Sequence, residues 1–192
     1  MNDLTRITRI SAVALAAALS LGAAQAADPI KIGVAEALSG GAAQYGISIR
    51  NGFQMAVEEI NAAGGVNGSK IELVIEDEQG KKDEAINAFK KLIFQDKALM
   101  LFGPTLSNSA AAADPIAQAA HVVVFGTSNT ADGITSIGNF IFRNSVTEAD
   151  VLPATIETVK RKTGLKQVAV LYGNDDVFTK SGYDNFKKAL DD

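Results

Sequence analysis

Short apolar runs alternate along the chain with longer segments in which apolar residues recur every three or four positions. The runs are typical of buried strands, and the spaced segments are typical of helices packed on one side. In HVVVF and QVAVLY the apolar stretch is uninterrupted after the first residue, as expected for a parallel sheet covered on both faces. The expected strands are residues 30–35, 70–76, 98–102, 122–125, 140–142 and 167–172.

The segments between these runs predict helices. The first carries Ile49, Phe53, Val57 and Ile60 on one stripe and ends at the glycines of AAGGVNG, which suit a helix end and a tight turn. The others cover residues 83–96, an alanine-rich segment to about 120, 148–162 and 180–190. Strand and helix in strict alternation predict an α/β fold with a doubly wound parallel sheet.

The last strand–helix pair has no successor in the sequence, so it either returns to the first sheet or begins a second unit, and we favour the second unit. With a boundary near residues 143–147, residues 27–145 form an N-terminal α/β lobe. Residues 146–192 then form a crossover helix and the first strand–helix unit of a second, similar lobe that is truncated.

Residues 1–26 have the layout of a secretory signal peptide. Arg6 and Arg9 precede an apolar run at 10–21, and Ala24-Gln25-Ala26 has the small-x-small form of a cleavage site. The run is too short to span a bilayer. We predict cleavage after Ala26 and a periplasmic product; a buried N-terminal helix is the alternative.

Composition narrows the function. The 192 residues carry 18 Lys and Arg against 22 Asp and Glu, a net charge of −4, and no basic block, which argues against nucleic acid or an anionic membrane as partner. Cysteine is absent, so cysteine catalysis, a thiolate metal site and a lipoprotein anchor are excluded. We therefore expect a core without disulfides and no direct membrane anchor.

Candidate chemistry is sparse. His121 is the single histidine and directly precedes a buried strand, which favours a structural role. No G-x-S-x-G elbow and no dinucleotide fingerprint are present. Glu76-Asp77-Glu78 lacks the spacing of a calcium loop, and we interpret it as an acidic strand end facing solvent. We expect no enzyme, no metal and no cofactor.

Polar loops follow several of the predicted strands, at the sheet edge where open parallel sheets bind ligands. The loops are LSGGAAQYG, GPTLSNS, GTSNT and GNDDVFTKSG, and two of them are rich in Ser, Thr, Asn and Gly. Hydroxyls and free N–H groups at a helix start bind anions. Ser107 is either an ordinary N-cap or part of such a site. Asp114-Pro115 could also start the helix, but we favour Ser107, with Pro115 as a kink within the helix.

The ordered combination of the export signal with IKIGVAEALSGGAAQYGISIRNGFQMAVEEINAAGGVNG, IEDEQGKKDEA, FGPTLSNS and GTSNTADGI resembles one family. It is similar to type I periplasmic solute-binding proteins of ABC transporters, in the branched-chain amino-acid (Leu/Ile/Val) binding class. The likeness runs from about residue 30 to the end of the chain. The resemblance implies two similar α/β lobes that close on a small ligand.

The resemblance also implies roles for seven residues. Ser107 would hold the ligand carboxylate through its hydroxyl and backbone N–H, flanked by backbone groups of Thr105 and Leu106. The remaining four are Ser128 and Thr130 in the matching loop, with Thr130 giving a second hydroxyl, Tyr45 as an aromatic cover, and Phe178 as the second-lobe aromatic.

Two departures affect the ligand. Phe178 stands where relatives often have tyrosine, which removes one polar contact, and the acidic partner of an amino-acid ammonium would lie beyond this chain. An aliphatic or aromatic acid or an amide therefore remains open as ligand. The function implied is that of a periplasmic receptor of an ABC importer that passes its ligand to a permease. The alternatives are an exported ligand-sensing domain of a receptor or regulator and, with little support from the residues, an exported hydrolase.

Overall fold

The computed structural model describes residues 27–164 and 166–191, so the predicted signal peptide lies outside the described residues. Five parallel strands form one sheet in the order β2-β1-β3-β4-β5. Their bounds are β1 (Ala27–Glu36), β2 (Ser69–Asp77), β3 (Met100–Phe102), β4 (Val123–Gly126) and β5 (Ile141–Arg143). The predicted α/β class and parallel sheet are confirmed.

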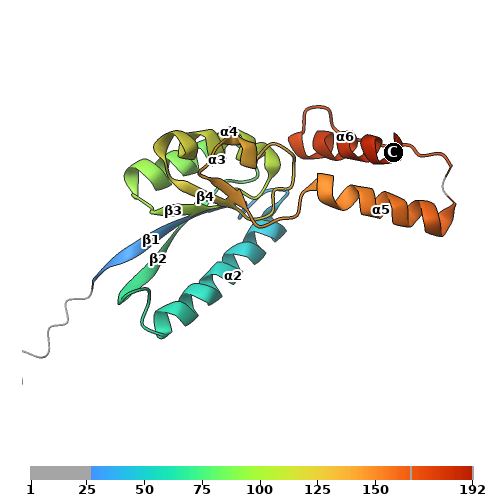
Figure 1. Ribbon diagram of the computed structural model, residues 1–192. Helices are drawn as coiled ribbons and strands as arrows, with labels where there is room; N and C mark the ends of the chain where they lie inside the picture. The colour runs from blue at the N-terminus through green and yellow to red at the C-terminus, as the bar shows by residue number, and fades with distance from the viewer. Residues whose placement is uncertain (1–26, 165, 192) are drawn as a thin grey trace, which may run out of the picture.

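Helices cover both faces of this sheet (Figure 1). On one side lies α2 (Ala43–Ala62), and on the other α3 (Lys82–Lys90), continued by a π-helical turn (Lys91–Gln95), and α4 (Ser107–Ala120). The short 3-10 turn Thr135–Ile137 precedes β5. Beyond the sheet, α5 (Glu148–Thr163) and α6 (Val177–Asp191) pack against each other.

The core lies between the sheet and the α3–α4 layer. Phe89 and Leu92 from the α3 side meet Leu101 of β3 and Val124 of β4, all fully buried. Helix α4 faces this core with Ala110, Ala113 and Ala117, which are also fully buried. Small side chains let a helix approach its neighbours closely, so the alanine-rich sequence of α4 brings its first turn near the carboxyl ends of β3 and β4.

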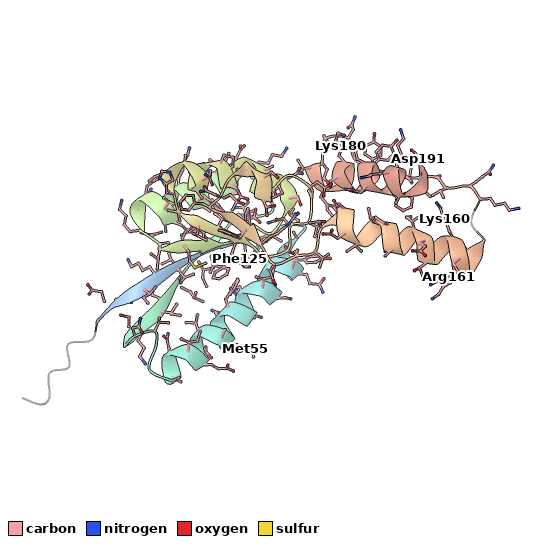
Figure 2. The ribbon with its side chains drawn as sticks, in the orientation of Figure 1. Met55, Phe125, Lys160, Arg161, Lys180 and Asp191 are labelled. Atoms are coloured by element: carbon pink, nitrogen blue, oxygen red, sulfur yellow. The ribbon has the colours of Figure 1, made fainter. Side chains whose placement is uncertain are left out.

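The α2 face is covered less completely than the sequence predicts. Phe53 of α2 packs on Phe102 with ring centroids 4.4 Å apart, and Phe102 contacts Phe125 edge-on at 6.0 Å. Ile60, expected on the same buried stripe, is 39% exposed, and Met55 is 64% exposed (Figure 2). The last turn of α2 is instead tied to β2 by Asn61, whose side-chain amide donates to the carbonyl of Ile71 and accepts from its N–H, both at 2.8 Å.

Gly46 sets the start of α2. A Cβ at this position would lie 2.1 Å from the carbonyl oxygen of Ala37, so a side chain cannot fit between α2 and the chain leaving β1. This close approach fixes the neighbouring Tyr45 at the carboxyl edge of the sheet.

The strand predicted at residues 167–172 is wrong, because residues 166–173 have no regular structure. Leu171 is 98% exposed and Val168 is 41% exposed. A strand is stabilised by hydrogen bonds to a neighbour, and within the described residues no strand lies beside this segment. The segment instead links α5 to α6, where Tyr172 stacks on Tyr183 with centroids 4.1 Å apart.

Helices α5 and α6 lie in the part of the chain that the sequence assigns to a second lobe. Lys160 on α5 donates to the carbonyl of Leu190 at 3.3 Å, and both helices extend away from the sheet (Figure 2). The division at residue 145 stays a prediction. Within the described residues, no helix is both long and apolar enough to cross a membrane.

Candidate functional site

A cavity of about 340 Å³ opens at the carboxyl edge of the sheet. Strand β1 leads to α2 on one face of the sheet and β3 leads to α4 on the other, so the chain diverges between these adjacent strands. Crevices at such a switch point are the usual ligand sites of open α/β sheets. The cavity is lined by Tyr45, Thr105, Leu106, Ser107, Ser128, Asn129, Thr130, Asp176 and Phe178.

All seven residues that the sequence singles out lie on this one cavity. They come from the start of α2, the loop after β3, the loop after β4 and the start of α6. The structure thus brings them together, and their contact with a ligand stays a prediction. Asn129 and Asp176 are additions that the sequence did not single out.

Ser107 is the first residue of α4 and is 2% exposed. Its Oγ accepts hydrogen bonds from the backbone N–H groups of Thr130 and Ala131, both at 3.3 Å. The N-cap position belongs to Leu106, so the interpretation of Ser107 as an ordinary N-cap is wrong. Because Ser107 Oγ accepts two bonds, its hydroxyl hydrogen is the part of the group left for a guest. Pro115 lies inside α4, as predicted.

Two further bonds tie the loops after β3 and β4 together. The Ser128 hydroxyl donates to the carbonyl of Thr105 at 2.6 Å, and the Asn129 amide donates to the carbonyl of Pro104 at 3.2 Å. Asn129 Oδ1 is buried and has no partner within the described residues. The two loops therefore form one rigid wall rather than two independent strands of chain.

Asn108 attaches the start of α6 to the start of α4. Its amide donates to Asp176 Oδ2 at 2.6 Å, and its Oδ1 accepts from the N–H of Val177 at 2.7 Å. Asp176 Oδ1 also accepts from the N–H of Thr179 at 2.7 Å, which caps α6. This pairing places Phe178, 48% exposed, at the cavity rim opposite Tyr45, 66% exposed.

Beneath the cavity wall lies a pair of fully buried carboxyl groups, Glu36 and Glu78. Glu36 accepts from the Thr105 hydroxyl at 2.5 Å and from the Thr127 hydroxyl at 2.8 Å. Thr105 Oγ1 accepts in turn from the N–H of Ala37 at 2.8 Å. Glu36 at the end of β1 is therefore bonded to both loops that form the cavity wall.

Glu78 corrects the interpretation of Glu76-Asp77-Glu78 as a solvent-facing strand end. Its Oε2 accepts from the Ser109 hydroxyl at 2.8 Å, whereas Oε1 has no partner in the described part of the chain. Asp77 accepts from the N–H groups of Leu38 and Gln79, at 2.8 and 2.9 Å. Glu76, which pairs with Lys91, and Asp77 are partly exposed, so the interpretation is wrong for Glu78.

Burial is the main reason why the pKa values of both carboxyl groups are raised. Burial raises the pKa of Glu36 to about 7; the hydrogen bonds from Thr105 and Thr127 oppose the rise, and the charge of Glu78 adds to it. Burial likewise raises the pKa of Glu78, against the hydrogen bond from Ser109.

The sequence offers a weak signal for these missed residues. Glu36 stands two positions after Val34 in a strand that alternates about the sheet, so the acid shares the side of a buried residue. Asn108 and Asp176 gave no signal, because the bond between them joins segments 68 positions apart. No cluster of three or more metal-ligating side chains occurs among the described residues.

Comparison with known proteins agrees with this architecture. A family model described as "Periplasmic binding protein" matches residues 29–192. The Leucine-, isoleucine-, valine-, threonine-, and alanine-binding protein of Pseudomonas aeruginosa is 35% identical over 168 residues, covering 87% of this chain and 44% of that protein. This chain therefore spans less than half the length of that relative.

Solved structures give the same picture. The branched-chain amino acid transporter substrate binding protein LivJ of Streptococcus pneumoniae, in complex with isoleucine, matches with a TM-score of 0.78 and 33% identity over 84% of this chain and 46% of that one. A solute binding protein of an ABC transporter from Rhodopseudomonas palustris, in complex with 3,4-dihydroxybenzoic acid, matches with a TM-score of 0.75 and 27% identity over 85% and 44%.

A doubly wound lobe with its cavity at the switch point, and a helix start facing that cavity, is the architecture of a type I ligand-binding lobe. The chain belongs to the periplasmic binding protein family, and within it to the type I proteins of the branched-chain amino-acid class.

Proposed function

We propose that the complete protein is the periplasmic receptor of an ABC importer and captures a small carboxylate-bearing ligand between two hinged lobes. The observation that carries this proposal is the state of Ser107. Its Oγ accepts two backbone N–H groups, which leaves its O–H to donate into the cavity. The first turn of α4 beside it adds N–H groups without intrahelical partners and the positive end of the helix dipole.

A carboxylate in this cavity would be held without a cationic partner, and the one charged lining residue, Asp176, accepts from Asn108 and Thr179. None of the nine lining residues is basic, so a bound anion relies on hydroxyl and N–H donors and on the helix dipole. The seven residues proposed to contact the ligand are those that the sequence singled out: Tyr45, Thr105, Leu106, Ser107, Ser128, Thr130 and Phe178.

The names of two related proteins indicate the class of ligand. One is named for binding leucine, isoleucine, valine, threonine and alanine, and one structural neighbour holds 3,4-dihydroxybenzoic acid. Both kinds of ligand join a carboxylate to an apolar body, which the aromatic rim of Tyr45 and Phe178 would cover. We therefore propose a branched-chain amino acid or a related aliphatic or aromatic acid or amide, bound without catalysis.

Transport follows from closure of the lobes. A ligand that contacts both lobes favours the closed state, because its binding free energy differs between open and closed forms. A permease that recognises the closed state would then accept only loaded receptor. Export through the predicted signal peptide, cleaved after Ala26, would place this receptor in the periplasm.

Thermal-shift screening of the complete protein tests this function. Branched-chain amino acids and 3,4-dihydroxybenzoate are expected to raise the melting temperature, by an amount that grows with ligand concentration, because only the folded state binds them. Simple amines, which have no carboxylate, serve as controls. A screen in which no carboxylate shifts the melting temperature would contradict the proposal.

Phe178→Ala provides a test of the rim. Removing the ring is expected to weaken binding of the ligand found in the screen by about 1 kcal/mol. The effect is modest because the ring is already half-buried, so a ligand would cover only the exposed half of its surface. Titration calorimetry measures the change. Phe142→Ala, on a ring that is 47% exposed but does not line the cavity, is the matched control. Equal affinities of Phe178→Ala and the parent protein would place Phe178 outside the site.

A further inference from the structure

The buried pair Glu36 and Glu78 lies directly behind the wall of the cavity. Thr105 lines the cavity, and its hydroxyl donates to Glu36, so the side chain of one residue separates the cavity from the buried acid. Ser109, in the first turn of α4, joins Glu78 to the same helix that starts at Ser107. Both acids therefore contact the elements that would hold a carboxylate.

No cation balances the pair within the described residues, since the ion pairs found there involve neither Glu36 nor Glu78. Fully buried carboxylates without a cationic partner are unfavourable, and two adjacent ones are more so. The arrangement of lower free energy keeps a proton on one of the two carboxyl groups. A third carboxylate, brought into the cavity by a ligand, would add to the repulsion.

We infer that Glu36 is a positioning residue for both binding loops and that a carboxylate ligand binds more tightly when the Glu36–Glu78 pair holds a proton. This inference rests on the proposed function. Binding and protonation are then linked: the bound anion favours proton uptake by the pair, and proton loss at higher pH weakens binding. Glu36 acts through the Thr105 and Thr127 hydroxyls rather than by touching the ligand.

Among the surrounding charged groups, Glu78 is the one that acts on Glu36. The titratable and charged groups on the elements around this end of β1 are Arg50 on α2, Asp77 and Glu78 at the end of β2, Lys82, Asp83 and Glu84 at the start of α3, Asp114 on α4, Arg143 on β5 and Glu148 on α5. Lys82 and Asp83 are exposed. Asp77 is turned to Ser39, Arg143 donates to the carbonyl of Ala131, and Arg50 bonds Asn51 at the surface. Of these groups, Glu78 is the one whose charge acts on the pKa of Glu36.

The pH window follows from the direction of the shift. Burial raises the pKa of Glu36 to about 7, so the ligand-free protein loses this proton between about pH 6 and 8. The carboxylate of isoleucine stays ionised throughout this range. Affinity for isoleucine or 3,4-dihydroxybenzoate is therefore expected to fall about three- to tenfold from pH 6 to pH 8, within the limit of tenfold per pH unit for one proton.

Titration calorimetry on the complete protein tests the linkage. Isoleucine and 3,4-dihydroxybenzoate are the probes, measured at pH 6, 7 and 8 in pairs of buffers with different ionisation enthalpies, which reports proton uptake directly. Wild-type protein should take up a fraction of one proton near pH 7, whereas 3,4-dihydroxybenzamide, which has no carboxylate, should cause no uptake. Glu36→Gln should abolish the uptake and flatten the pH profile.

Two more variants keep the test decisive. Glu76→Gln changes a partly exposed acid on β2 and should leave the pH profile as in wild type. Glu78→Gln removes the like charge beside Glu36 and should move the midpoint of the profile to lower pH, which tests the pair even if Glu36→Gln does not fold. If the role of Glu36 were purely structural, Glu36→Gln would lower affinity equally at every pH.

The outcomes separate the two proposals. Binding of either carboxylate with no proton uptake, or uptake unchanged in Glu36→Gln, would overturn this inference and leave the receptor function intact. If neither carboxylate binds at any pH, the proposed function falls and this inference falls with it.

Discussion

Replacing Ser107 with alanine is expected to weaken ligand binding by about 1–3 kcal/mol, or roughly five- to 150-fold in affinity. The substitution removes the O–H that would donate to the ligand carboxylate. It also removes the acceptor of the Thr130 and Ala131 N–H groups, which lie at 3.3 Å from Oγ. The wall of the site thus loses a donor, and two of its N–H groups lose their shared acceptor.

Titration calorimetry with the ligand found in the screen measures this loss. Ser136→Ala, which removes an exposed hydroxyl in the turn before β5, is the matched control and should bind as the parent does. Chemical unfolding of both variants separates lost binding from lost stability. Unchanged affinity in Ser107→Ala would remove Ser107 from the site.

The placement of Ser107 shows which kind of feature can be predicted well from the sequence. The apolar runs before residues 103 and 126 are uninterrupted, and parallel strands end at the same edge of a sheet. Once the runs are strands, the loops after them must lie side by side, as the bonds between Ser128 and Thr105 and between Asn129 and Pro104 show.

The missed features depend on partners that are distant in sequence. Burial of Glu36 needs Thr105 and Thr127, which are 69 and 91 positions away. An acid at the end of a strand predicts nothing about its burial until those hydroxyls are placed beside it. The failed strand at 167–172 has the opposite cause: its apolar pattern fits a sheet, but no neighbouring strand is present in the described residues to pair with it.

The buried acids also predict that the stability of this lobe depends on pH. Glu36 and Asp114 are both fully or almost fully buried, and burial raises the pKa of Asp114 to about 8. For a carboxyl whose folded pKa lies above its unfolded value, the folded state holds the proton longer. The free energy of unfolding is then greatest below the unfolded pKa and falls as pH rises towards the folded pKa.

Asp114→Asn is expected to raise the free energy of unfolding at pH 7.5 by about 2–4 kcal/mol. Asp114 is 1% exposed, lies on α4 among buried alanines, and its Oδ1 has no partner within the described residues. Each unit of a pKa shift corresponds to roughly 1.4 kcal/mol, and the larger amide, which must place two N–H donors, reduces the gain. Because Pro115 has no N–H, the carbonyl of Ala111 lacks its helical donor and is available as an acceptor.

Urea unfolding of the complete protein between pH 4.5 and 8.5 measures this effect. The gain from Asp114→Asn should be small at pH 4.5, where the aspartate is protonated in the folded state at little cost, and should grow to its full size near pH 8. The fall in stability that remains between pH 5 and 7 in the variant is expected from the Glu36–Glu78 pair, since burial raises the pKa of both carboxyl groups. Asp184→Asn, at an exposed position on α6, is the control and should change stability by less than about 0.5 kcal/mol. A pH profile in Asp114→Asn that runs parallel to that of the parent would show that Asp114 is not the buried acid that titrates.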